Sequence, residues 1–239
     1  MATELGPNIV QDNLQLSLDI GSTRSYPGSG TTVTCLVSGI TFTPDVNAPS
    51  FVTSGIAHVD MEEDNPDNLK STSDYSDMNT QGIYTRIAWF NIESSDSNFK
   101  PIIGNVVGNN IDMSLSIVNY RLHFRQYTNT GNTGTTSGDY GIDGTAQISA
   151  NTWVQGAIVV DRSAQTVAFY INGALDASKS IAVIGNSSSK RVLIGGPDTD
   201  SYSGARYFDG KIARVSHYDR ALSAAEIAKD YNAFKNRFE

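Results

Sequence analysis

The chain has 239 residues, of which 39% are hydrophobic and 18% are charged, so it can bury a core and is not an intrinsically disordered chain. The formal net charge of −8 argues against nucleic acid as a partner, because phosphate contacts need a basic face. The single cysteine, Cys35, excludes an internal disulfide framework, and we expect it to be a small buried side chain.

The amino-terminal stretch MATELGPNIVQDN has neither the basic nor the apolar region of a signal peptide. No apolar run approaches the ~18 residues that a membrane helix needs. We therefore expect a chain that is made in the cytosol and does not bind a membrane, with residues 1–11 as an amino-terminal arm.

Strand patterns then recur at short intervals. In the first, Leu14–Ile20, the alternation predicts Leu14, Leu16 and Leu18 on one face. The later candidates are Ile83–Ile92, 102–107, 113–118, 120–124, Trp153–Asp161, Thr166–Ala174, 190–196 and 211–219. We see no linker and no repeat, so residues 1–239 are interpreted as a single domain of two sheets with six or seven strands each.

Two of these patterns make sharper predictions. In 120–124, Leu122 and Phe124 should face one way, and Arg121 and His123 the other. Asn172-Gly173 predicts a two-residue hairpin turn, since both turn positions need a positive φ.

Three polar stretches interrupt the strands and are interpreted as long surface loops: His58–Met78, with seven acidic residues and one lysine, Thr128–Thr145 and Gly195–Arg206. Long loops in a compact domain are often functional.

The carboxyl-terminal stretch predicts one amphipathic helix over residues 223–237. Ser223 and Glu226 form a capping box, and Leu222 with Ile227 forms a hydrophobic staple. An apolar stripe at helical spacing should pack this helix on a sheet; its members are Ile227, Tyr231, Phe234 and Phe238.

Three stretches resemble laminin-G-like domains of the concanavalin A-like lectin/glucanase superfamily. They are YDRALSAAEI before the aromatic helix, NTWVQGAIVVDRSAQTVAFYINGAL in the centre, and RIAWFNI followed by PIIGN. The resemblance implies an all-β fold, an antiparallel two-sheet sandwich of the concanavalin A-like jelly-roll type, with one carboxyl-terminal helix.

The stretches LQLSLDIGSTRSYPGSGTT and YNAFKNRFE resemble laminin-G-like proteins carried by tailed bacteriophages. The stretch TCLVSGITF departs from that pattern, so the resemblance does not predict the structure of the sheet edge near Cys35. The resemblance implies a non-catalytic structural or adhesion protein located on the virion, as a head decoration or tail component. Its partners would be other virion proteins, and it could bind host surface glycans weakly. The resemblance does not decide whether the protein forms a homo-oligomer. The alternatives are a stand-alone cellular carbohydrate-binding lectin and, less favoured, a glucan hydrolase.

Catalysis finds little support in the sequence. Glucanases that resemble this fold carry Glu-x-Asp-x-Glu on one strand, and none of the six glutamates is spaced in that way. The three histidines are isolated in the sequence, and we expect no enzymatic activity.

Candidate ligand residues lie in or beside the polar loops. Tyr140, Tyr202, Tyr207 and Arg206 could contact a sugar or a protein, and the tyrosines could equally cap the ends of the sandwich. Asp139 with Asp143, or Asp198 with Asp200, could bind Ca²⁺, as some laminin-G domains do, but the favoured interpretation is that these aspartates support turns. No cofactor is required.

Overall fold

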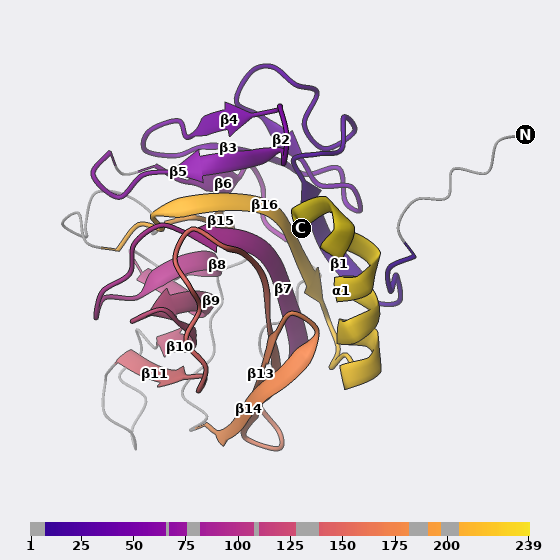
Figure 1. The fold of residues 1–239 in the computed structure, drawn as a ribbon, viewed down its shortest axis with the longest axis vertical. Helices are drawn as coiled ribbons and strands as arrows, with labels where there is room; N and C mark the ends of the chain where they lie inside the picture. Colours follow the sequence, from indigo (N-terminus) through magenta and orange to yellow (C-terminus); the bar gives the residue numbers. More distant parts are fainter. Residues whose placement is uncertain are drawn as a thin grey trace, which may run out of the picture.

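The computed structural model describes residues 8–65, 67–75, 82–107, 110–127, 139–181, 191–196 and 206–239. Within these ranges the chain folds into two eight-stranded antiparallel sheets and one helix, which confirms the predicted sandwich (Figure 1). Each sheet has more than the expected six or seven strands, because several strands of two to four residues are too short to show a periodic pattern.

Sheet A runs in the order β14-β13-β12-β7-β16-β5-β4, and β1 pairs with β16. Its strands are β14 (Ala174–Ser180), β13 (Thr166–Ile171), β12 (Trp153–Asp161), β7 (Ile83–Ile92), β16 (Gly210–Tyr218), β5 (His58–Met61), β4 (Ser50–Val52) and β1 (Leu14–Asp19).

Sheet B runs in the order β11-β10-β9-β8-β15-β6-β3-β2. Its strands are β11 (Asp139–Asp143), β10 (Arg121–Tyr127), β9 (Asn110–Val118), β8 (Lys100–Val107), β15 (Val192–Ile194), β6 (Leu69–Ser71), β3 (Thr41–Pro44) and β2 (Val33–Thr34).

The main core lies between the sheets and follows the alternation in the sequence. Leu122 and Phe124 are buried in it, as predicted. Leu16 and Leu18 lie there as well, but Leu14 packs in a separate cluster under the helix, so the prediction for Leu14 is wrong. The reason is a bulge between Leu14 and Leu16, which reverses the side-chain direction along β1.

Two of the predicted loops contain strands. The stretch His58–Met78 contains β5 and β6, and Asp67 within it is only 2% exposed, so this stretch is not simply a surface loop. β11 lies within Thr128–Thr145. Residues 128–138 and 197–205 lie outside the described residues.

The helix α1 (Ala224–Phe238) begins as the sequence predicts. Ser223 is the N-cap, its hydroxyl accepts from the Glu226 amide, and the Glu226 carboxylate accepts from the Ser223 amide. Leu222 and Ile227 are buried in one cluster, which confirms the staple. In Figure 1, α1 lies on the side of sheet A that faces away from β8–β11, so it covers the outer face of that sheet.

A buried ion pair attaches α1 to sheet A. Asp230 on the helix is fully buried, and its Oδ1 accepts from Arg214 Nη1 on β16 and from Gln155 Nε2 on β12, each at 3.0 Å. The Arg214 guanidinium also lies 4.0 Å from the centre of the Phe234 ring. One carboxylate therefore binds the helix to two strands of the sheet.

Aromatic rings complete the contact between α1 and the sheet. Trp89 on β7 stacks on Phe238 at 4.1 Å and on Tyr231 at 5.6 Å between ring centres. Phe234 and Phe238 are buried, whereas Tyr231 is half-buried. The predicted stripe is thus the face that packs on the sheet.

The free Cys35 is buried, as expected. Val10, in the predicted arm, is also buried, and its carbonyl oxygen accepts from the Tyr218 hydroxyl. In the described part of the chain, no helix is both long and apolar enough to cross a membrane.

Substituting Asp230→Ala should destabilise the protein by about 3–5 kcal/mol, because Arg214 would remain buried without its partner. Asp230→Asn should cost less, since the amide oxygen can still accept from Gln155. Urea unfolding measures both. Lys229→Ala, at the exposed neighbouring position, is the control and should stay within about 0.5 kcal/mol of the wild type. Equal stability of the Asp230→Ala and Lys229→Ala variants would refute this role for the ion pair.

The burial of Asp67 predicts that the free energy of unfolding depends on pH. Burial raises the pKa of Asp67 from 3.8 to about 7; the carboxylates of Glu62 and Asp60 act in the same direction, and the Glu62 amide, which donates to it, acts against them. The contribution of Asp67 to stability is therefore complete below about pH 4 and is lost as the pH rises to about 7. Asp67→Asn does not titrate, so the variant should gain stability relative to the wild type across that range.

Denaturant unfolding at pH 4, 6 and 8 measures the difference in stability between Asp67→Asn and the wild type. The substitution Asp64→Asn, at an exposed position, is the control. A difference that does not change with pH contradicts the prediction.

Candidate binding site

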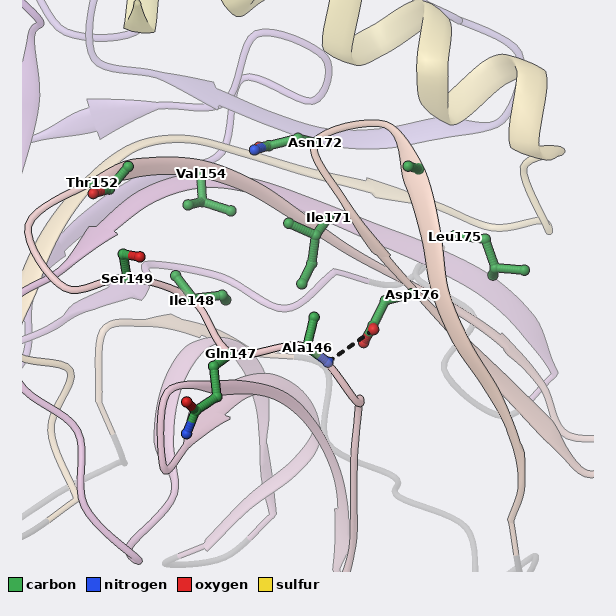
Figure 2. A pocket seen from close by; sticks show the side chains of 11 residues that line it. Ala146, Gln147, Ile148, Ser149, Thr152, Val154, Ile171, Asn172, Leu175 and Asp176 are labelled. Atoms are coloured by element: carbon green, nitrogen blue, oxygen red, sulfur yellow. Dashed lines mark hydrogen bonds between the residues drawn. The ribbon is translucent and has the colours of Figure 1, made fainter.

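A groove lies beside the hairpin that joins β13 to β14 (Figure 2). Its volume is about 430 Å³, within the range of ~300–1,000 Å³ that is usual for ligand sites. One wall is the segment between β11 and β12, and the other is the hairpin. The lining residues are Ala146, Gln147, Ile148, Ser149, Thr152, Val154, Ile171, Asn172, Ala174, Leu175 and Asp176.

The groove has an aliphatic floor and a polar rim. Ile148 and Val154 are both 5% exposed and belong to the main core, and Ile171 packs against that core. Gln147 and Ser149 are exposed on one wall. The site therefore offers hydrogen-bonding side chains around an apolar surface, which is a common design of ligand sites.

Asp176 holds the two walls together. Its Oδ2 accepts from the Thr145 amide at 2.7 Å, and its Oδ1 accepts from the Ala146 amide at 2.9 Å (Figure 2 shows the second bond). Gly144 allows this approach, since a Cβ atom there would lie 2.5 Å from Asp176 Oδ2. The carboxylate thus fixes the opening of the groove.

The hairpin turn is formed as predicted. Asn172 and Gly173 have φ values of 50° and 78°, and Asn172 Oδ1 accepts from the Gln155 amide at 2.9 Å. A Cβ atom at Gly173 would lie 2.9 Å from Tyr231 Cβ, so the turn rests directly on α1. The helix therefore supports one wall of the groove.

The lining residues include one carboxylate, Asp176, and two backbone amides already donate to it. A glycosidase needs two carboxyl groups, ~5 Å apart in the retaining enzymes. The lining shown in Figure 2 holds no such pair, so its residues can bind a ligand but do not form an acid–base couple.

Outside the groove, the strand register places Ser116, His123 and Asp143 next to one another on β9, β10 and β11. His123 Nδ1 lies 2.6 Å from Asp143 Oδ1, so this histidine is not isolated as the sequence suggested. A Cβ atom at Gly141 would lie 2.3 Å from His123 Cε1 and 2.5 Å from Nε2. The imidazole therefore lies over β11, on the side away from Ser116, and the three residues do not form a catalytic triad.

The predicted ligand residues do not lie in the groove. Tyr207 is 1% exposed and packs closely over Gly196, so its ring cannot stack on a sugar, contrary to the prediction for this residue beside the polar loop. Arg206 lies 4.9 Å from the centre of the Phe99 ring, over which Arg125 also lies at 3.8 Å. Tyr140 is on β11, where its side chain is not described, and Tyr202 lies outside the described residues.

The two predicted calcium-binding pairs lie in different parts of the chain, and the structure describes only one of them. Asp139 and Asp143 are at the two ends of β11, about 13 Å apart along the strand at ~3.3 Å per residue, and the side chain of Asp139 is not described. Asp198 and Asp200 lie outside the described residues. Among the residues that are described, no group of three or more His, Cys, Asp or Glu side chains could hold a metal ion.

Sequence reasoning missed the groove because its walls come from separate parts of the chain. Thr145 and Asp176 are far apart in sequence, and no local pattern joins them. The one available signal was the Asn172-Gly173 turn, which places β14 but says nothing of the segment that lies against it.

Similar solved structures share this fold. They include the binding domain of paraclostridial mosquitocidal protein 1 (TM-score 0.69, 15% identity, covering 94% of this chain and 53% of that one). Two others are the binding domain of botulinum neurotoxin DC in complex with rat synaptotagmin II (0.67, 14%, 92% and 51%) and botulinum neurotoxin type C, whose cell entry depends on two ganglioside molecules (0.67, 14%, 92% and 51%).

The chain spans about half the length of these structures, and at such identities the likeness concerns the fold alone. No curated protein matches the chain by sequence. A family model does match: the laminin-G-like model of the concanavalin A-like lectin/glucanases superfamily covers residues 64–228, which is more than half of the chain. The protein therefore belongs to the laminin-G-like family of the concanavalin A-like lectin/glucanases superfamily.

Proposed function

We propose that the protein is a non-catalytic attachment protein of a tailed-phage particle and that the groove of Figure 2 binds a glycan. The observation that carries the glycan proposal is the chemistry of the lining. A pyranose presents C–H groups on its faces and hydroxyls around its edge. The aliphatic floor at Ile148 and Val154 suits the first, and the polar rim at Gln147, Ser149 and Thr152 suits the second.

The names of similar structures support an attachment role in general terms. A neurotoxin binding domain of this fold is complexed with a protein, synaptotagmin II, and another neurotoxin interacts with gangliosides. Because the identities are 14%, these ligands do not transfer to this chain residue by residue.

The virion location rests on the two stretches that resemble phage-borne laminin-G-like proteins, LQLSLDIGSTRSYPGSGTT and YNAFKNRFE. Display on a particle also fits a small, open groove. A weak site gains avidity when many copies engage one surface, by factors of ~10²–10⁴.

The two rival functions differ from this proposal in specific ways. A cellular lectin would use the same groove but would not be part of a particle. A glucan hydrolase would need a second carboxylate near Asp176, and the lining residues provide none.

Filling the groove should abolish glycan binding. Ser149→Trp places an indole at an exposed rim position, and we expect at least a tenfold loss of binding to whichever sugars of a glycan array the wild type binds. Ser54→Trp, at an exposed position on the chain segment before β5, is the matched control and should bind as the wild type does. Unchanged binding by a folded Ser149→Trp protein would show that the groove is not the glycan site.

Quantitative mass spectrometry of purified particles tests the location. We expect the protein at a constant number of copies per particle, unchanged when the particles are washed in high salt. Absence from particles, together with abundance in the cell lysate, would favour the cellular lectin instead.

A further inference from the structure

We infer that the groove selects uncharged glycans and rejects acidic ones, an inference that rests on the proposed function and names its ligand class. The basis is the charge of the lining. Among the lining residues that the structure describes, Asp176 alone is charged, and neither lysine nor arginine is present. Arg121 is near, but it donates Nε to the Thr145 carbonyl oxygen and is not part of the lining.

Asp176 is placed to accept from a ligand as well as from the protein. Each oxygen of an ionised carboxylate has about two lone-pair sites, and each Asp176 oxygen accepts one backbone amide. One acceptor site on each oxygen therefore remains. Two adjacent hydroxyls of a hexose have the spacing to donate to both oxygens of one carboxylate, which is a geometry that an uncharged sugar can use.

An acidic sugar can present the same pair of hydroxyls, but its own charge carries a cost. Its carboxylate would enter a groove that already contains the Asp176 carboxylate, and no cation of the lining would balance either charge. The apolar floor strengthens the repulsion, because it lowers the local dielectric. The net charge of −8 acts in the same direction at longer range, although salt screens it beyond ~8 Å.

The remaining rim side chains are neutral and can serve any sugar. Gln147 and the Ser149 hydroxyl can each donate and accept, whereas Asn172 Oδ1 also accepts from the Gln155 amide and the Thr152 hydroxyl also donates to the Ala150 carbonyl oxygen. Selection by charge therefore depends on Asp176, whereas selection by shape and by hydroxyl pattern depends on the neutral rim. Substitutions that change only the charge of the rim can therefore test the charge preference separately from the other two.

Paired hexose and hexuronate conjugates test the inference, since each pair differs only in CH₂OH against carboxylate at C6. Polyacrylamide carrying glucose or glucuronate, galactose or galacturonate, and mannose or mannuronate would be measured by biolayer interferometry. We expect the hexose of at least one pair to bind tenfold or more tightly than its uronate, which corresponds to about 1.4 kcal/mol. Asp176 itself is unsuitable for substitution, because it holds the groove walls together.

Gln147 provides the matched variants. Gln147→Lys places a cation of similar length at the rim of the groove and should reduce the preference for the hexose at least threefold. Gln147→Glu, of nearly the same size, should leave that preference unchanged or increase it. The same direction of change in both variants would contradict a charge mechanism.

The possible failures are distinguishable. If uronates bind as tightly as hexoses and Ser149→Trp abolishes both, the groove is a glycan site and the charge inference is wrong. If no conjugate binds, both the proposed glycan function and this inference are wrong.

Discussion

The Asp230 carboxylate is the contact on which the rest of the arrangement depends. It is buried with Arg214 and Gln155, so it can be satisfied only when α1 lies in one position on sheet A. That position puts Tyr231 against the Gly173 turn, and the turn forms one wall of the groove. The other wall is attached through Asp176. A buried ion pair on one face of the sheet is thus connected, through the helix and the hairpin, to the candidate site.

Much of this architecture was predictable from local patterns. The capping box, the staple, the aromatic stripe and the Asn172-Gly173 turn each involve residues close in sequence, whose geometry follows from the backbone. Asp230 was not predictable as a buried residue, because an aspartate on an amphipathic helix is expected to face water unless an unseen partner balances it. The bulge at the start of β1 was missed for a similar reason, since it depends on pairing with β16.

The candidate site was much less predictable than the fold. Composition pointed to tyrosines and aspartates in the polar stretches, but Tyr207 is buried, and Asp139 and Asp143 lie at opposite ends of the extended strand β11. The groove instead uses ordinary residues such as Gln147, Ser149 and Val154, which no motif distinguishes. Their significance comes only from the register that brings the segment after β11 against the β13–β14 hairpin.

The central claim is that this groove is where the protein meets a glycan, and amide chemical-shift mapping tests it most directly. Titration with a methyl hexopyranoside, followed by ¹H–¹⁵N spectra, should shift the amides of residues 146–149, 152 and 172–176. Amides on α1 that face away from the sheet, such as Lys229, should not move. Shifts confined to another face, with the groove amides unchanged at saturating sugar, would contradict the account.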